Sequence, residues 1–94
     1  MPSFTPDRSI FRTVALNTID TVVFNDAGTA FRVLNRGASD LWVRVDGMNP
    51  AASTDGSRLI REGEVRSFND PSGNKEIRLT AGTLGCLYGV ELEG

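Results

Sequence analysis

The sequence predicts an all-β fold, an antiparallel two-sheet β-sandwich or jelly roll of about seven strands, with a small barrel as the second choice. Three observations predict it. Short runs rich in β-branched and aromatic residues alternate polar and apolar side chains along most of the chain. Turn-forming residues, among them 10 glycines and 4 prolines in 94 residues, interrupt these runs at short intervals. Apolar residues nowhere keep the 3.6-residue period of an amphipathic helix across ten positions.

The first eleven residues differ from the rest because their apolar residues follow no regular period. Two prolines delete backbone donors there, and polar residues separate the apolar side chains of Phe4, Ile10 and Phe11. We therefore expect residues 1–11 to form an extended N-terminal arm that is ordered on a neighbouring subunit. Residues 12–94 are then a single β-sandwich domain. The alternative is a terminus whose apolar residues fold back on their own domain.

From residue 12 onward, a period of two marks the strands. The clearest strand covers residues 41–46, with Leu41, Val43 and Val45 on its buried face. A short glycine-containing loop joins this run to residues 31–35, so the two are expected to form an antiparallel hairpin. The full set of expected strands is 13–16, 21–24, 31–35, 41–46, 58–61, 64–68, 75–80 and 84–92.

Turn chemistry places the loops between these strands. Residues 46–57 are small, polar and rich in turn formers, so they are expected to form the longest loop. Residues 69–74 are dense in Asn, Asp, Ser and Gly and predict another turn. In the last strand, the alternate residues from Leu84 to Leu92 are expected on one face, opposite Leu87 and its neighbouring glycines.

The composition removes the commonest catalytic chemistry. The chain has no histidine and one cysteine, so zinc sites with nitrogen and sulfur ligands and His-based triads lack their groups. We expect no enzyme, no cofactor and no metal, and we expect Cys86 to be a small buried hydrophobe. Glu62 and Glu64 flank a glycine bend, where a solvated turn is favoured over a carboxylate pair.

The longest loop carries oxygen ligands of the kind that calcium prefers. Asp46, Asn49 and Asp55 do not match the spacing of a known calcium loop, and Asp-Gly pairs are equally what tight turns require. Turn chemistry is therefore the favoured interpretation.

Charge and hydropathy restrict the partners. The net charge is -2, and the basic residues are spread along the chain, so no nucleic-acid stripe is predicted. The longest aliphatic or aromatic run is three residues, far short of a membrane span, and no secretory signal is recognised. Of the 10 basic residues only Lys75 is lysine, and arginine is favoured at protein interfaces, although codon bias gives the same excess.

Six residues are the candidate partner-binding positions. Trp42 and Arg44 lie on the side of their strand opposite Leu41, where an outward tryptophan beside an arginine is typical of an interface anchor. The alternatives are a sugar-stacking platform and a strand covered on both faces by the arm or a loop. The complete set is Phe4, Ile10, Phe11, Trp42, Arg44 and Leu87.

The turn motifs carry a resemblance to a known group. A hairpin with Asn35 and Gly37 precedes a strand that ends in Asp46-Gly47, and a Gly/Asp loop and a Gly turn follow. The matching residues are Asn35, Gly37, Asp46, Gly47, Pro50, Asp55, Gly56, Gly63 and the segment from Leu87 to Glu91. Over about two-thirds of the chain, this pattern resembles small all-β virion proteins of tailed bacteriophages.

This resemblance implies a capsid decoration or cement protein. Such a protein is made in the host cytoplasm, binds the major capsid protein on the outer surface of the virion, and ties neighbouring capsid subunits together. A homo-oligomer is implied, with a trimer favoured. The N-terminal arm has no counterpart in the group. The alternatives are a carbohydrate-binding module for host attachment and a head-tail or tail-associated adaptor.

Overall fold

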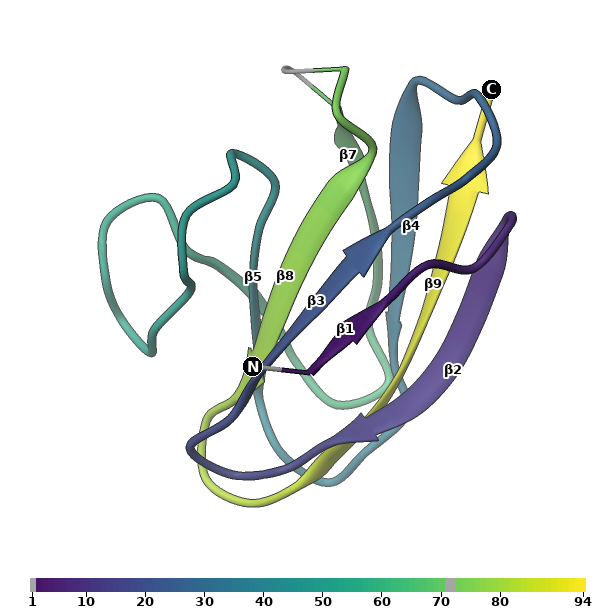
Figure 1. Cartoon of the computed structure of the whole chain (residues 1–94). Helices are drawn as coiled ribbons and strands as arrows, with labels where there is room; N and C mark the ends of the chain where they lie inside the picture. The colour runs from purple at the N-terminus through teal and green to yellow at the C-terminus, as the bar shows by residue number, and fades with distance from the viewer. Residues whose placement is uncertain (1, 71–72) are drawn as a thin grey trace.

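A computed structural model describes residues 2–70 and 73–94, and over these ranges the chain forms nine strands in two sheets and no helix (Figure 1). The predicted all-β, two-sheet class is therefore confirmed. The strands are β1 (Ser3–Phe4), β2 (Ser9–Val14), β3 (Ile19–Val23), β4 (Ala30–Asn35), β5 (Leu41–Arg44), β6 (Arg58–Ile60), β7 (Val65–Asn69), β8 (Glu76–Ala81) and β9 (Cys86–Glu93).

The strands alternate between the two layers as the chain proceeds. One sheet has five strands in the order β1-β3-β8-β5-β6, and the other has four in the order β2-β9-β4-β7 (Figure 1). Every connection between consecutive strands crosses from one sheet to the other, except that between β5 and β6. This crossing pattern is that of a double-stranded β-helix, a form of jelly roll.

The core lies between the inner faces of the two sheets. Leu41 and Val43 are fully buried there, as their alternation predicts, and Val45 packs against them. From the four-stranded sheet, Cys86, Tyr88, Val90 and Leu92 are buried as expected. The expected fifth member of that row, Leu84, precedes β9 and is exposed.

The hairpin expected from residues 31–35 and 41–46 is wrong. β4 belongs to the four-stranded sheet and β5 to the five-stranded sheet, so residues 36–40 cross the sandwich. The side-chain amide of Asn35 stabilises this crossing segment, because its Nδ2 donates to the carbonyl oxygens of Ser39 and Ile60, each at 2.8 Å. Gly37 allows the crossing loop to approach β9, because a Cβ there would lie 2.6 Å from the backbone nitrogen of Leu87.

The extended arm expected at residues 1–11 is wrong for its described residues 2–11, which contribute β1 and the first part of β2 to the two sheets, while residue 1 lies outside the described residues. The expected boundary at residue 11 falls within β2. β1 pairs in parallel with β3, and β2 pairs antiparallel with β9 along its whole length. Phe4 and Ile10 pack against the core, and the guanidinium of Arg12 lies 3.8 Å from the centre of the Phe4 ring. Burial of these side chains explains why the segment folds back on its own domain.

The remaining loops follow the turn chemistry. The longest loop joins β5 to β6, as expected, whereas the expected strand at residues 13–16 is shifted and lies at residues 9–14. The turn expected at residues 69–74 includes residues 71–72, which lie outside the described residues. A search of the described residues finds no helix with the length and hydropathy of a membrane span.

Candidate interaction surface

The outward-pointing side chains of the four-stranded sheet form a continuous surface, which we call the four-strand face. Strand register places Phe11 opposite Gly89, Gly89 opposite Leu34, and Leu34 opposite Val65, so one row crosses all four strands. Residues with the same orientation complete the face: Ser9, Thr13, Ala30, Arg32, Ser67, Asn69, Leu87, Glu91 and Glu93.

Apolar side chains are exposed on this face. The exposed fractions are 54% for Phe11, 42% for Val65 and 41% for Leu87. An antiparallel sheet that meets water on one side normally shows polar residues there. The other large hydrophobic side chains with high exposure, Leu16, Met48 and Leu84, lie in loops. The four-strand face is therefore the place where exposed apolar side chains gather on strands.

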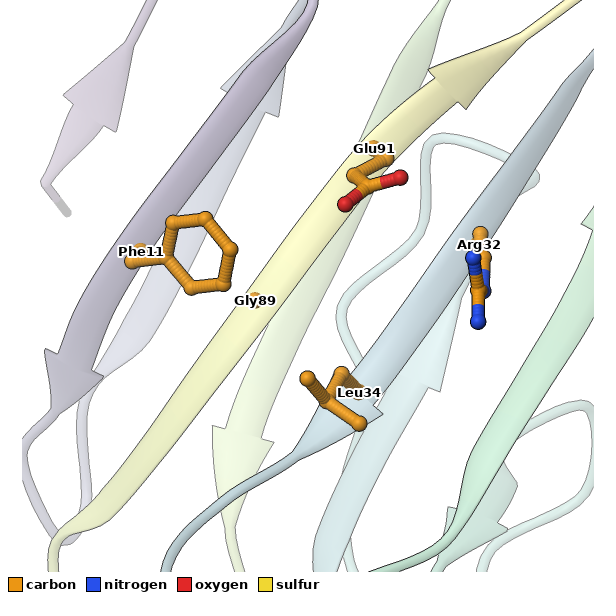
Figure 2. A pocket seen from close by; sticks show the side chains of 5 residues that line it. All are labelled: Phe11, Arg32, Leu34, Gly89 and Glu91. Carbon is orange, nitrogen blue, oxygen red and sulfur yellow. The ribbon is translucent and has the colours of Figure 1, made fainter.

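A small pocket lies in the middle of the four-strand face. Its volume is about 90 Å³, and it is lined by Phe11, Arg32, Leu34, Gly89 and Glu91 (Figure 2). The missing side chain of Gly89 creates the floor, and the Phe11 ring leans across it: a Cβ on Gly89 would lie 2.5 Å from a carbon of that ring. Arg32 and Glu91 are register partners on β4 and β9, so opposite charges lie side by side next to the apolar row.

The outer face of the five-stranded sheet, which we call the five-strand face, is covered in part by the long loop, and a groove of about 330 Å³ lined by Ile19, Thr80 and Pro50 remains beside that loop. The face consists of the outward residues of its five strands, namely Ser3, Ile19, Thr21, Val23, Glu76, Arg78, Thr80, Trp42, Arg44 and Leu59. Arg78 donates to Glu76 Oε2 at 2.7 Å and to Asn49 Oδ1 at 2.6 Å, which ties the long loop to the sheet. Pro50 of that loop is buried.

Arg44 lies on this face under the long loop and forms hydrogen bonds with it. Its guanidinium forms an ion pair with Asp46 and donates to the carbonyl oxygen of Asp55 at 2.6 Å. The hydrogen bonds that Asp46 accepts from the Arg44 guanidinium, together with one from the Met48 backbone N–H, lower the pKa of Asp46 to about 2. A Cβ on Gly56 would clash with the same guanidinium, and Gly56 has a φ of +82°. The arginine thus takes the space at the centre of the loop.

The other side-chain oxygens singled out in the sequence bind groups of the same chain. Asp46 forms an ion pair with Arg44, and Asn49 Oδ1 accepts a hydrogen bond from Arg78. These oxygens of the long loop therefore bind guanidinium groups. Glu64 Oε1 accepts from the Arg61 backbone N–H across the glycine bend. Within the described ranges, no three His, Cys, Asp or Glu side chains are grouped so that they could hold a metal ion.

A polar cluster lies between the sheets. The Tyr88 hydroxyl donates to Asp20 Oδ2 at 2.9 Å, and Arg12 Nε lies 3.9 Å from the same oxygen. Asp20 is 1% exposed, and burial raises its pKa, while the Tyr88 bond and the Arg12 charge oppose that shift. Burial likewise raises the pKa of Tyr88. The cluster joins β3 of one sheet to β9 and β2 of the other.

A second buried cluster surrounds Asn35 and uses the single cysteine. Asn35 Oδ1 accepts from the Gly37 N–H at 3.0 Å and from the Cys86 thiol at 3.1 Å. Burial raises the pKa of Cys86, which disfavours the reactive thiolate. Asn35 and Cys86 therefore have a structural role at the crossing between the sheets.

The six residues proposed from sequence separate into three places. Phe11 and Leu87 come together on the four-strand face. Phe4 and Ile10 are half-buried against the core. Trp42 and Arg44 lie on the five-strand face, where Trp42 is half-buried beside Gly82 and Arg44 is engaged in the loop.

Sequence reasoning missed Leu34 and Val65. The alternation within residues 31–35 indicated the orientation of Leu34. Phe31 and Val33 face inward, so Leu34 lies on the outer side with Arg32. The position of Val65 opposite Leu34 required the pairing of β7 with β4, which no local pattern contains.

Comparisons with known proteins bear on the fold. No family model and no curated protein matches the chain. The solved structure of PirA is similar, with a TM-score of 0.64 and 14% identity over 94% of this chain and 95% of that one. A de novo designed double-stranded β-helix has a TM-score of 0.62 and 18% identity, and the match covers 92% of this chain and 99% of the design.

A third solved structure carries the same architecture. The cupin_2 domain of an XRE family transcriptional regulator from Enterobacter cloacae has a TM-score of 0.61 and 13% identity, over 92% of this chain and 79% of that domain. At such identities the likeness shows the fold alone. Together with the crossing topology, it makes the chain a small double-stranded β-helix domain.

Proposed function

We propose that this chain is a structural protein of a bacteriophage particle that binds neighbouring subunits of the major capsid protein and stabilises the shell. The single observation that carries the proposal is the four-strand face, where Phe11, Val65 and Leu87 are exposed on a sheet rather than on a loop. A protein that works by docking requires such a surface, and it requires no catalytic group.

The turn motifs give the proposal its particular partner. Asn35 and Gly37 make the crossing between the sheets, and Gly56 and Gly63 adopt positive φ angles in the turns that follow. These are the positions at which the sequence resembles small virion proteins of tailed bacteriophages. The resemblance and the exposed face together favour a protein on the outer shell over a free-standing domain.

The proposed mechanism is stabilisation by mass action. A protein that binds the assembled shell, and does not bind its separated subunits, shifts the equilibrium toward the shell by RT ln(1 + [L]/Kd). At a hundredfold excess over Kd, each bound copy contributes about 2.7 kcal/mol. The effect multiplies over many copies, so modest affinity per copy is sufficient.

Particles with and without the protein test the proposal. We expect particles that lack it to release their DNA at a lower temperature, and we expect added purified protein to restore the loss. Val65→Lys on the four-strand face should fail to restore it, whereas Leu16→Lys in the β2–β3 loop, which alters a side chain of matched exposure, should succeed. Equal release temperatures with and without the protein would remove the proposal.

Copy number separates this role from its alternatives. A cement protein is present in numbers commensurate with the shell lattice, whereas an adaptor is present in about a dozen copies or fewer. Quantitative mass spectrometry of purified particles measures the difference. Glycan binding by the isolated domain that is lost in Trp42→Ala would instead favour a carbohydrate-binding module.

A further inference from the structure

We infer that, in the protein free of the shell, the four-strand face binds the same face of a second copy of the chain in a two-fold dimer, and that the capsid protein replaces this contact on the shell. The inference rests on the proposed function only in taking this face as the working surface. It is argued from the arrangement of charges, bulk and space across the strands β2-β9-β4-β7.

The strand order gives the face a natural two-fold axis. An axis parallel to the strands and placed between β9 and β4 exchanges these two central strands, and it exchanges the edge strands β2 and β7. Sheets that pack face to face keep their strand directions within about 30° of each other, so this axis is compatible with ordinary sheet packing. Each residue of the face then meets the residue that occupies the exchanged strand in the same row.

Charge is self-complementary about this axis. Arg32 on β4 and Glu91 on β9 are register partners, so the axis passes between them. It brings Arg32 of one copy opposite Glu91 of the other, and the reverse pair forms at the same time. Both side chains are exposed in the single chain, and opposition of unlike charges fixes the register of a face-to-face pairing.

Apolar groups also meet one another about this axis. It brings Leu34 opposite Gly89 and the Phe11 ring that leans across it, and it brings Phe11 opposite Val65. The pocket of about 90 Å³ in one copy therefore faces Leu34 of the other copy. The outer members of the next row, Ser9 and Ser67, also exchange, so small polar residues meet at the rim.

The expected dimer is weak. Four strands spaced about 4.8 Å apart and about six residues long give a flat footprint of roughly 400 Å² per copy. A standard stable interface takes about 800 Å² per partner. The dimer should therefore dissociate on dilution, and the capsid protein that we propose for the same face should displace it.

Sedimentation velocity from the low-micromolar to the millimolar range tests the inference on the full chain. We expect the wild type to pass from monomer to dimer. Arg32→Glu and Glu91→Arg, each alone, place like charges opposite one another across the axis and should remain monomeric. An equimolar mixture of the two variants should form dimers, because every charge pair across the axis then joins one acidic and one basic side chain.

The mixture is the decisive arm, because mixing leaves the neighbours within each chain unchanged. Arg61→Glu reverses an exposed charge in the turn after β6 and should dimerise like the wild type. Thermal unfolding of every variant checks that the fold is retained. A monomeric wild type at all concentrations, a trimer, or a mixture that stays monomeric would overturn the inference.

Failure of the dimer is distinguishable from failure of the proposed function. If the wild type is monomeric but still raises the DNA-release temperature of particles, the dimer is refuted and the structural role stands. If the wild type dimerises through this face but is absent from particles, the role is refuted and the dimer stands.

Discussion

The two outer faces of the sandwich are built from the same alternation and differ in what covers them. On the five-strand face, the long loop is tied down through Arg44 and Arg78, and its Pro50 is buried. On the four-strand face, Phe11 and Leu87 remain exposed. One face is partly covered by a loop of the same chain, whereas the other is open, and we propose that a partner covers it.

The difference shows how two similar sequence signals acquire different meanings. Trp42 beside Arg44 has the pattern of an interface anchor, but the arginine binds its own loop through Asp46. Phe11 has the pattern of a loose terminus, but pairing of β2 with β9 fixes it on an open sheet. Whether an outward side chain is exposed depends on which sheet the long loop covers, and the strand topology decides this.

The largest expected effect comes from the crossing on which both faces depend. Asn35→Ala should lower the free energy of unfolding by about 3 kcal/mol, because the buried carbonyl oxygens of Ser39 and Ile60 lose their donor. Chemical denaturation measures it. Asn25→Ala, which removes an exposed amide bonded to Thr5 and Asp7, should cost about 1 kcal/mol or less. Equal losses in the two variants would contradict the structural role of Asn35.

The next effect concerns the polar cluster between the sheets and depends on pH. Burial raises the pKa of Asp20 above its ordinary value of 3.8, so the folded state binds the proton more tightly than the unfolded state. The stability of the wild type relative to Asp20→Asn should therefore fall as the pH rises from below 3.8 through the raised pKa, and then level off. Asn keeps an acceptor for the Tyr88 hydroxyl. A stability difference between the wild type and Asp20→Asn that is constant with pH would contradict the raised pKa of Asp20.

A smaller effect should be confined to the loop that covers the five-strand face. Arg44→Met should speed amide exchange in residues 45–57 and leave exchange in β9 unchanged, because the loop loses its central hydrogen bonds. The pKa of Asp46 should rise from about 2 toward its ordinary value of 3.8. Because the pKa of Asp46 is lowered in the wild type, the stability that its ion pair with Arg44 gives the folded state is complete above pH 3.8. It is lost as the pH falls toward about 2. Arg61→Met is the matched control.

The smallest effect on stability should come from the open face. Val65→Thr keeps the shape of an exposed side chain, so the free energy of unfolding of the monomer should change by about 0.5 kcal/mol or less. Association should nevertheless weaken, which sedimentation measures. Val23→Thr makes the same change on the five-strand face and should leave association unaffected. Equal effects of the two variants on association would remove the distinction between the faces.

The sequence predicted most strands because alternation is a local property. Leu41 and Val43 are buried as their spacing indicates, and the turn-rich segment after β5 is the longest loop. The hairpin between residues 31–35 and 41–46 was wrong because a turn signal shows where the chain bends and does not show into which sheet it goes. Here a buried amide at Asn35 directs the chain across the sandwich.

The candidate surface was predicted in part. Phe11 and Leu87 were chosen as partner-binding residues for separate reasons, and strand pairing brings them onto one face. Leu34 and Val65 were missed because their places follow from the long-range pairing of β4 with β9 and β7. The arm was expected to be separate because its apolar residues lack a period, yet Phe4 and Ile10 pack against the core from two different sheets.

Surface labelling of the protein, free and on purified particles, tests the central claim most directly. Carbene footprinting reports which side chains become covered on assembly. The account predicts protection of Phe11, Val65 and Leu87 on the particle, with Leu16 and Met48 labelled equally in both states. Labelling of Phe11, Val65 and Leu87 that is unchanged by assembly, with new protection at Trp42, would contradict it.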